Sequence, residues 1–440
     1  MLAPLGNLSV SPYLRRRLLA ALVIVGTLAA LVVQAQAARA DSVRPPRAYF
    51  GMHDGSTQAY DTLSYGSLRL WDAGVTWPDI ETSPGVYDWS RLDALVSAAQ
   101  EHGVEVTLVL AMTPSFYGPA STLPPTDLSA YADYVRAVMT RYRDFNGERG
   151  IAAYEVWNEG NVPTFWTGTP AQLAQLTRIV WQTRQQVDPG ATVVGPSFAV
   201  RLAGQRQWLS DYTSQQVGGR PVWRYYDATG LSLYPKATYG DRIGGPEDAM
   251  ALLVEARRHL AAAGAPADQP IWGTEVNYGV TSDASAATPI SNRRQVANVI
   301  RTYLLGAAQG LQRMFWYRYD WGLVPGGTLG NTLLATPGSY NEVTPAGDAV
   351  VTAQAWMKGR LVGRHGQAPC HQDVKGTFTC LVKHAGGVRT ILWNPRHRVR
   401  VPVPRGANLV QNAHGVTSRI AGRQSTMSVS YLPVMVNSPH

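Results

Sequence analysis

The sequence predicts an α/β protein, a (β/α)8 TIM barrel followed by a small C-terminal antiparallel β domain. Short apolar, β-branched runs alternate with amphipathic helical segments through most of the chain, which is typical of a parallel α/β sheet. Eight such runs are present, the number that closes a barrel. After about residue 360 the pattern changes to short β-rich pieces separated by turn residues. We therefore expect the barrel over 44–358 and a β-sandwich-like domain over 361–440.

The barrel strands are expected where short apolar runs end at turn residues. The clearest is 104–111, VEVTLVLA, which is apolar enough to be buried on both faces. The segment before it has apolar residues at helical spacing and ends at Gly103, a typical helix C-cap. The strands are expected at 48–52, 67–70, 104–111, 151–157, 191–195, 230–233, 270–274 and 311–317. Helices are expected at 91–102, 129–142, 171–187, 247–263, 293–309 and 349–359.

A doubly wound open sheet is the structural alternative to a barrel. No Gly-x-Gly-x-x-Gly motif follows an early strand, so a nucleotide-binding fold is disfavoured. In the C-terminal region, alternating apolar and polar residues predict antiparallel strands at 377–382, 388–393, 399–403 and 427–436.

Residues 1–40 have the pattern of an export signal. An arginine cluster at 15–17 precedes an apolar run at 18–33, and two small-x-small motifs follow at 35–37 and 38–40. The apolar run is shorter than the ~20 residues that usually span a bilayer. We therefore favour a signal peptide cleaved before Asp41 over a retained signal anchor, and expect a secreted or cell-envelope-associated protein.

The basic charge of the chain is modest once this segment is set aside. Four of the arginines behind the formal net charge of +9 lie in residues 1–40, which leaves +5 with no lysine-rich run. This balance favours an anionic cell-wall or membrane surface only weakly. Nucleic acid is disfavoured because no recognition motif accompanies the charge. We expect a monomer.

The two cysteines, Cys370 and Cys380, predict a disulfide, because closely spaced pairs in exported proteins are usually oxidised. Two free thiols are the alternative. A zinc site would need four ligands, and only His371 and His384 are near by in the sequence. We expect neither a metal nor another cofactor.

Two glutamates follow predicted strands at the positions where barrel enzymes carry their catalytic groups. Glu159 follows the fourth strand and Glu275 the seventh, and the C-terminal ends of barrel strands converge on one mouth. A single strand-end glutamate is more often an ion-paired surface residue. Two facing carboxylates are what glycosidic cleavage needs: a retaining enzyme holds them ~5–5.5 Å apart and an inverting one ~6.5–9.5 Å apart.

The motifs around these glutamates resemble those of clan A glycoside hydrolases, and family 39 in particular. YEVWNEGN at 154–161 resembles the acid/base motif, and IWGTEVNYG at 271–279 is similar to the nucleophile strand. The segments 69–89 and 315–321 resemble the second and eighth strands of these enzymes with their following loops. The resemblance implies retention, with Glu159 as general acid/base and Glu275 as nucleophile.

Further site residues are implied by the same resemblance or by position. Arg69 would hold the nucleophile, Trp316 would form the floor of the sugar subsite, and Tyr234 would hydrogen-bond Glu275. Asn158 is placed to bind the sugar 2-hydroxyl. His53 is a candidate sugar ligand, and the candidate stacking platforms are Trp71, Trp166, Tyr278 and Trp321. Trp77 and Trp89 are expected to pack beside a helix, and Glu155 to belong to the barrel interior.

Two departures from the family pattern stand close to the glutamates. Gly160 replaces a proline, and Ser232 stands where relatives often carry histidine. The second change puts the standard substrates of the family in doubt.

Three functions are compatible with these features. The favoured one is an exported retaining glycosidase that acts on a polysaccharide or oligosaccharide. The alternatives are an inactive carbohydrate-binding envelope protein on a degenerate barrel and a scaffold that acts through its C-terminal sheet. The intact pair Glu159 and Glu275 favours the enzyme. The sugar stays open among xylosides, glucosides, iduronides, exopolysaccharides and galactofuranosyl or arabinosyl chains.

Overall fold

The fold was analysed in a computed structural model that describes residues 42–57, 60, 63–280, 288–319, 334–336, 339–363 and 367–439. The predicted signal segment 1–40 and the candidate platform Trp321 lie outside the described residues. Within the described ranges, the helices are all too short or too polar to cross a membrane.

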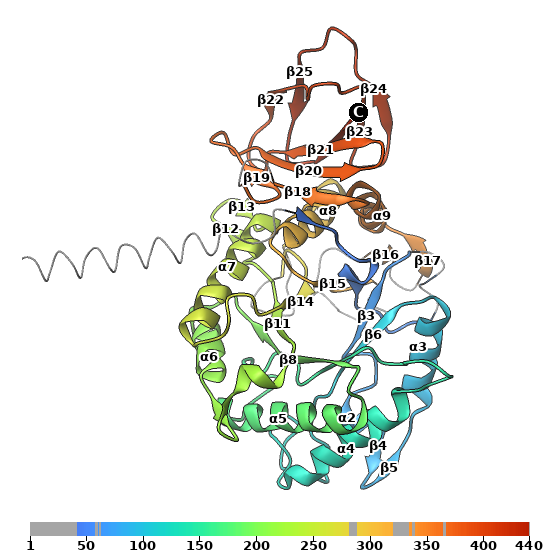
Figure 1. The fold of residues 1–440 in the computed structure, drawn as a ribbon, viewed down its shortest axis with the longest axis vertical. Coiled ribbons are helices and arrows are strands. Elements are labelled where there is room, and N and C mark those ends of the chain that lie inside the picture. Colours follow the sequence, from blue (N-terminus) through green and yellow to red (C-terminus); the bar gives the residue numbers. More distant parts are fainter. Residues whose placement is uncertain are drawn as a thin grey trace, which may run out of the picture.

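Eight parallel strands close into a barrel, which confirms the predicted fold class (Figure 1). Around the barrel, each strand pairs with the next in chain order, and the last returns to the first. The strands are β2 (Phe50–Met52), β3 (Ser67–Leu70), β6 (Glu105–Val109), β7 (Ala153–Glu155), β8 (Thr192–Ala199), β11 (Ala228–Ser232), β14 (Ile271–Val276) and β15 (Arg313–Trp316).

Helices surround the barrel and pack apolar side chains against it (Figure 1). They are α2 (Trp77–Ile80), α3 (Ser90–Glu101), α4 (Leu128–Tyr142), α5 (Pro170–Val187), α6 (Ala203–Thr213), α7 (Pro246–Ala262), α8 (Asn292–Ala308) and α9 (Pro345–Met357), with 3-10 turns η1 (Arg47–Tyr49) and η2 (Val222–Tyr225). Local sequence fixes their starts. In α5, for example, Thr169 and Gln172 form a capping box and Pro170 takes the first helical position, where its missing N–H costs nothing.

Short hairpins fill some of the connections between these elements. They pair β4 (Glu81–Ser83) with β5 (Val86–Tyr87), β9 (Gln216–Val217) with β10 (Arg220–Pro221), β12 (Thr238–Tyr239) with β13 (Arg242–Ile243), and β16 (Ala335–Thr336) with β17 (Ser339–Val343).

Irregular pairing decides which side chains point into the barrel. Along β14, Gly273 pairs with Leu231 while Glu275 pairs with Ser232, so β14 carries one extra residue at this point. An extra residue reverses the in-and-out alternation of a strand. Trp272 packs in the barrel interior against Phe315, and the shift allows Glu275, three residues later, to point to the same side.

The C-terminal region forms an antiparallel sheet beside the barrel, with a two-stranded ribbon packed on it (Figure 1). The sheet contains β18 (Arg360–Val362), β19 (His371–Gln372), β20 (Phe378–His384), β21 (Gly387–Trp393), β23 (Leu409–Asn412), β24 (Thr417–Arg419) and β26 (Val434–Ser438). The ribbon pairs β22 (Val399–Pro402) with β25 (Thr426–Val429). A small core between sheet and ribbon includes Leu392, Met427 and Val436. The sheet also receives β1 (Ser42–Val43), which pairs with β18 before the chain enters the barrel.

Buried polar contacts join this sheet to the barrel helices. Trp393 of β21 donates its indole N–H to Glu247 of α7 at 2.8 Å, and Glu247 forms an ion pair with Arg301 of α8. Trp356 of α9 donates to Gln411 of β23 at 2.5 Å. Hydrophobic residues of sheet and barrel belong to one continuous core, so the two parts support each other.

Some predicted boundaries were wrong. Residues 48–49 belong to the 3-10 turn η1 rather than to the first strand, and the last helix begins at Pro345, before the predicted 349. Helix α6 and the β4–β5 hairpin were not predicted. In α6 only Leu209, Tyr212 and Thr213 are buried, so its apolar stripe is too short to give a clear helical period.

The predicted Cys370–Cys380 disulfide is present, with ten residues of sequence separation. A loop of this length is expected to contribute about 2.5 kcal/mol by restricting the unfolded chain. The double variant Cys370→Ser/Cys380→Ala should lower the free energy of unfolding by about this amount in urea denaturation. Adding reductant should destabilise the wild type but leave the variant unchanged. An equal effect of reductant on both proteins would contradict a stabilising disulfide.

Candidate active site

A pocket of about 440 Å³ opens where barrel strands end, and both predicted catalytic glutamates line it. Glu159 follows β7 and Glu275 lies in β14. Trp71, Asn158 and Tyr234, three of the predicted binding residues, also line this pocket. The structure therefore brings the acid/base candidate, the nucleophile candidate and part of the predicted binding set into one cavity.

Arg69 lies beneath the pocket and organises it. The guanidinium donates to both oxygens of Glu155, at 2.7 and 2.6 Å, and to Oε1 of Glu275 at 2.8 Å. It also donates to Oδ1 of Asn158 at 2.9 Å. Because Arg69 and Glu155 are fully buried, their pairing holds the guanidinium in one orientation, from which it fixes Glu275. The expected role of Glu155 in the interior is confirmed.

Both oxygens of Glu275 have a donor. Arg69 binds Oε1, and the Tyr234 hydroxyl donates to Oε2 at 2.8 Å, as the sequence predicted. Two directed donors keep this carboxylate in a single orientation with its charge delocalised over both oxygens. This is the arrangement that a positioned nucleophile requires.

Glu159 is held from its backbone. Its amide N–H donates to the Ser197 hydroxyl at 2.8 Å, and its φ of +39° lies in the left-handed region that non-glycine residues rarely adopt. Such conformations gather at active sites, where the surrounding structure enforces them. The following Gly160 donates its N–H to Ser197, and a Cβ at Gly160 would approach Leu173 to 2.5 Å. A proline at this position would lose the hydrogen bond to Ser197 and would collide with Leu173. This explains the departure from the family pattern.

The two glutamates titrate as a pair. Burial raises the pKa of Glu159, against the opposing effects of the Ser232 hydroxyl, Arg69 and Arg201. Burial also raises the pKa of Glu275; Arg69 opposes it and the charge of Glu159 adds to it. Since Glu275 has the closer cation and a phenol donor, we assign the first ionisation to Glu275 and the retained proton to Glu159.

Two residues predicted to contact sugar do not reach the pocket. Trp316 is fully buried and packs against Tyr278 and Tyr303, which lie on the outer side of the strands. Tyr278 is also fully buried, and its hydroxyl pairs with Thr302 of α8. Side chains alternate along a strand, so it is Tyr317, next to Trp316, that faces inward and lines the pocket.

His53 and Trp166, two further candidate sugar ligands, do not line the pocket. His53 is 1% exposed and its Nε2 lies 2.9 Å from the carbonyl oxygen of Thr274, where it supports the strand that carries Glu275. Burial and the charge of Arg69 lower the pKa of this histidine, so it is neutral and donates to that carbonyl. Trp166 is 3% exposed and packs edge-on against Trp157, below the pocket surface.

Besides Tyr317, sequence reasoning missed several pocket residues, among them Phe165, Arg201 and Gln205. Phe165 stands edge-on to Trp71, so the two rings form one aromatic corner of the cavity. Arg201 lies in the segment that links β8 to α6, and Gln205 lies in the first turn of α6. The unpredicted helix is the reason that no pattern marked them as site residues.

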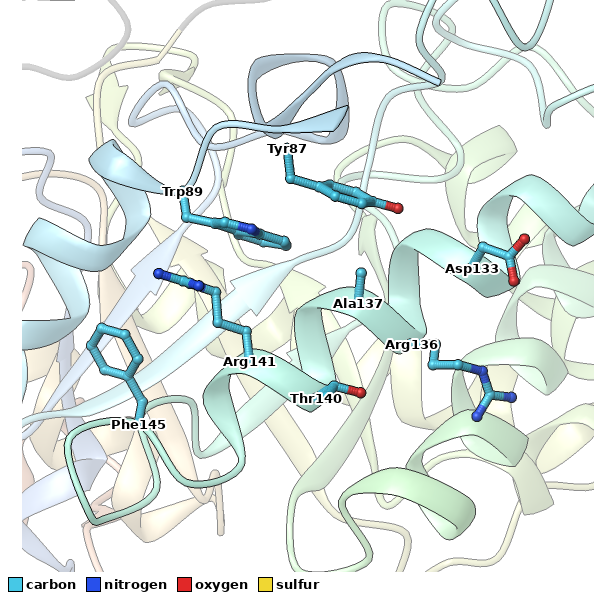
Figure 2. A pocket seen from close by; sticks show the side chains of 8 residues that line it. All are labelled: Tyr87, Trp89, Asp133, Arg136, Ala137, Thr140, Arg141 and Phe145. Carbon is cyan, nitrogen blue, oxygen red and sulfur yellow. The ribbon is translucent and has the colours of Figure 1, made fainter. Parts of the chain in front are cut away.

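A second hollow, of about 610 Å³, lies on the outer surface beside α4, away from the glutamates (Figure 2). Its most prominent ring, Trp89, is stacked on Tyr87 with ring centroids 5.0 Å apart, and the Arg141 guanidinium covers the indole at 5.3 Å. Figure 2 shows these two groups on opposite sides of the indole. Both faces of Trp89 are therefore occupied, and the expectation that it packs beside a helix is confirmed.

A closed parallel barrel that brings two strand-end glutamates into one pocket has the architecture of clan A glycoside hydrolases. Solved structures of that class are similar to this chain over nearly its whole length. A family 39 glycoside hydrolase from the gut symbiont Bacteroides cellulosilyticus superposes with a TM-score of 0.66 at 16% identity, covering 90% of this chain and 81% of its own. A family 39 β-xylosidase from Caulobacter crescentus gives 0.59 at 16% identity, covering 91% and 98%. A glucosidase from Croceicoccus marinus gives 0.63 at 14% identity, covering 90% and 96%.

Sequence comparison gives a shorter match. A curated β-xylosidase from Geobacillus stearothermophilus is 28% identical over 100 residues, which make up 22% of this chain and 19% of that protein. No family model matches the chain. The predicted resemblance to family 39 and its clan is thus confirmed at the level of fold. In the part of the chain that the structure describes, no cluster of three or more histidine, cysteine or acidic side chains is arranged to hold a metal.

Proposed function

We propose that this protein is a retaining glycoside hydrolase with Glu159 as general acid/base and Glu275 as nucleophile. The observation that carries the proposal is the unequal environment of two buried glutamates in one pocket. Arg69 and Tyr234 hold Glu275 as an oriented anion, whereas the buried Glu159 keeps its proton. One pocket thus offers an acid and a nucleophile at the same pH.

The reaction follows from these two states. The carboxylate of Glu275 attacks the anomeric carbon while Glu159 gives its proton to the leaving oxygen, and the glycosidic bond breaks. Esterification removes the charge of Glu275, so Glu159 becomes a stronger acid and stays ionised. Glu159 then takes a proton from the water that attacks the anomeric carbon, and the ester bond to Glu275 breaks.

The remaining pocket residues suit a sugar. Asn158 accepts from Arg69 through its oxygen, so the group it offers a ligand is its NH₂, a donor for a sugar hydroxyl. Trp71 and Tyr317 supply aromatic surface on the same pocket. This combination of apolar rings and a few directed polar groups is typical of small-molecule sites.

Export is part of the proposal. The N-terminal pattern of arginines, apolar run and small-x-small motifs supports a secreted or cell-envelope-associated protein. The disulfide agrees with folding in an oxidising compartment. A polysaccharide or oligosaccharide of the cell wall or surroundings is then the substrate class. β-Xylosides and β-glucosides come first among test compounds, because a β-xylosidase and a glucosidase are among the similar proteins.

The test is hydrolysis of a panel of aryl glycosides and envelope glycans, followed by proton NMR of the first-formed sugar. We expect at least one member to be cleaved with retention of the anomeric configuration. An inverted product would exclude the double displacement. Binding of a glycan without turnover of any panel member would instead favour the inactive carbohydrate-binding protein.

A further inference from the structure

Arg201 is the one cation among the described residues that line the active-site pocket. Arg69 lies below the pocket, and its guanidinium is engaged by two carboxylates. Arg201 differs from it in position and in partners. It follows β8 and reaches across the neighbouring strand ends, where the backbone after β11 and β14 holds it.

Neutral groups fix the Arg201 guanidinium. Nε donates to the carbonyl oxygen of Tyr234 at 3.0 Å, and one terminal nitrogen donates to that of Val280 at 3.3 Å. Within the described ranges, none of the ion pairs includes Arg201. The side chain is partly buried, and burial lowers its pKa. Among the described residues, the structure thus keeps a positive charge at a partly desolvated position with no carboxylate in an ion pair with it, which costs free energy unless a ligand supplies the anion.

A second donor lies on the same wall. Gln205 accepts the backbone N–H of Leu202 through its Oε1 at 2.9 Å, which orients the side-chain amide. Its Nε2 is therefore the group that Gln205 can offer to the pocket it lines. Arg201 and Gln205 together present N–H donors, one of them charged, in a cavity that bears aromatic rings elsewhere.

This wall lies on the acid/base side of the pocket. The loop that carries Glu159 is bound to it, because the Asn161 side chain donates to the carbonyl oxygens of Ala199 and Gln205 at 2.7 and 2.9 Å and accepts the Ala199 N–H at 2.9 Å. The positive charge of Arg201 also acts on Glu159, whose pKa it lowers. The acid/base delivers its proton to the leaving oxygen, so the sugar beyond that oxygen lies nearest to Glu159. A substituent on the leaving-group sugar is thus the part of a substrate that Arg201 can reach.

We propose that Arg201, assisted by Gln205, is a specificity-determining residue that binds an anionic substituent on the leaving-group side of the substrate. A carboxylate, as in a uronic acid, matches the flat guanidinium and its parallel donors. A sulfate or phosphate ester shares this chemistry, and the test separates the sources. The leaving-group side is defined by the proposed glycosidase function, so the proposal rests on that function. The predicted binding of an anionic glycan does not itself require turnover.

The experiment measures glycan binding by calorimetry in the Glu275→Gln background, so that bound glycan is not consumed. Uronic-acid oligosaccharides are compared with their carboxyl-reduced forms, and sulfated or phosphorylated oligosaccharides with their desulfated or dephosphorylated forms. We expect an anionic member to bind about 10- to 100-fold more tightly than its neutral partner. Adding Arg201→Met should remove most of this difference and leave the affinity for the neutral partner nearly unchanged. Arg201→Lys should restore part of it.

A matched control is Arg136→Met, which removes the same charge from the exposed face of α4. If this change weakened anion binding as much as Arg201→Met, the preference would be a general charge effect and the proposal would be wrong. It would also be wrong if no anionic oligosaccharide bound better than its neutral partner. A third contrary outcome is that Arg201→Met changes only the pH dependence of glycan binding that Glu159 controls, and changes it equally for neutral and anionic glycans. A protein that binds anionic glycans through Arg201 but hydrolyses nothing would contradict the proposed function and leave this inference standing.

Discussion

Replacing Glu275 with alanine should lower the turnover of an aryl glycoside on the order of 10⁴-fold to 10⁶-fold, since it removes the carboxylate that forms the covalent intermediate. Among the described residues, Glu155 is buried against Arg69, Asp72 pairs with Arg318, and Glu159 is committed to the acid/base role. Azide should restore part of the activity of Glu275→Ala and give a glycosyl azide of inverted anomeric configuration. The measurement is the rate of phenol release with and without azide, with the product identified by NMR. Unchanged turnover in Glu275→Ala would show that Glu275 is not the nucleophile.

Glu159→Ala provides the matched comparison. Loss of the general acid should cost about 10²- to 10⁴-fold for a poor leaving group and much less for an activated one that leaves without protonation. Burial raises the pKa of Glu159, so the wild-type rate should fall on the alkaline side as its proton is lost. That alkaline limb should vanish in Glu159→Ala, whereas the acid limb that reports ionisation of Glu275 should remain. Equal losses for both leaving groups would contradict the acid/base assignment.

The two glutamates could be predicted from the sequence because their position depends on topology. Once a barrel is expected, the C-terminal ends of its strands gather around one mouth, and the motifs around Glu159 and Glu275 identify which strand ends matter. Arg69, Asn158 and Tyr234 followed for the same reason. The hydrogen bonds of Arg69 and Tyr234 to Glu275 are those that the pattern implied, whereas the bond from Arg69 to Asn158 was not predicted.

The residues that form the binding surface could not be predicted in the same way, because they depend on which side of its strand each side chain points to. Trp316 and Tyr317 are neighbours, and only the exact phase of β15 decides that the tyrosine lines the pocket. The extra residue before Glu275 changes that phase in β14, and nothing in IWGTEV marks it. Arg201 lies in a connection whose course depends on tertiary contacts with the loops after β11 and β14. Length and composition of a loop do not encode such contacts.

Arg69→Met should have the largest effect on stability, because it removes the cation from between two buried carboxylates. Glu155 would then remain buried without its partner, and Glu275 would keep only the donor Tyr234. Breaking a buried ion pair in this way costs about 3–5 kcal/mol. Thermal and urea denaturation at neutral pH should detect this loss. The exposed pair of Arg141 and Asp93 supplies the control, since Arg141→Met should cost under about 1 kcal/mol.

The pH dependence of this loss gives the sharper test. Without Arg69, the pKa of Glu275 in the folded state, which burial already raises, should rise further above its unfolded value, because the guanidinium no longer opposes burial. A raised folded pKa means stability that is present at low pH and lost as pH increases, so the deficit of Arg69→Met should shrink toward pH 5 and grow toward pH 8. Adding Glu155→Gln should recover part of the stability by removing one buried charge, but turnover should stay low because Glu275 still lacks its clamp. A deficit that did not vary with pH would show that lost packing, rather than the unpaired carboxylates, destabilises the variant.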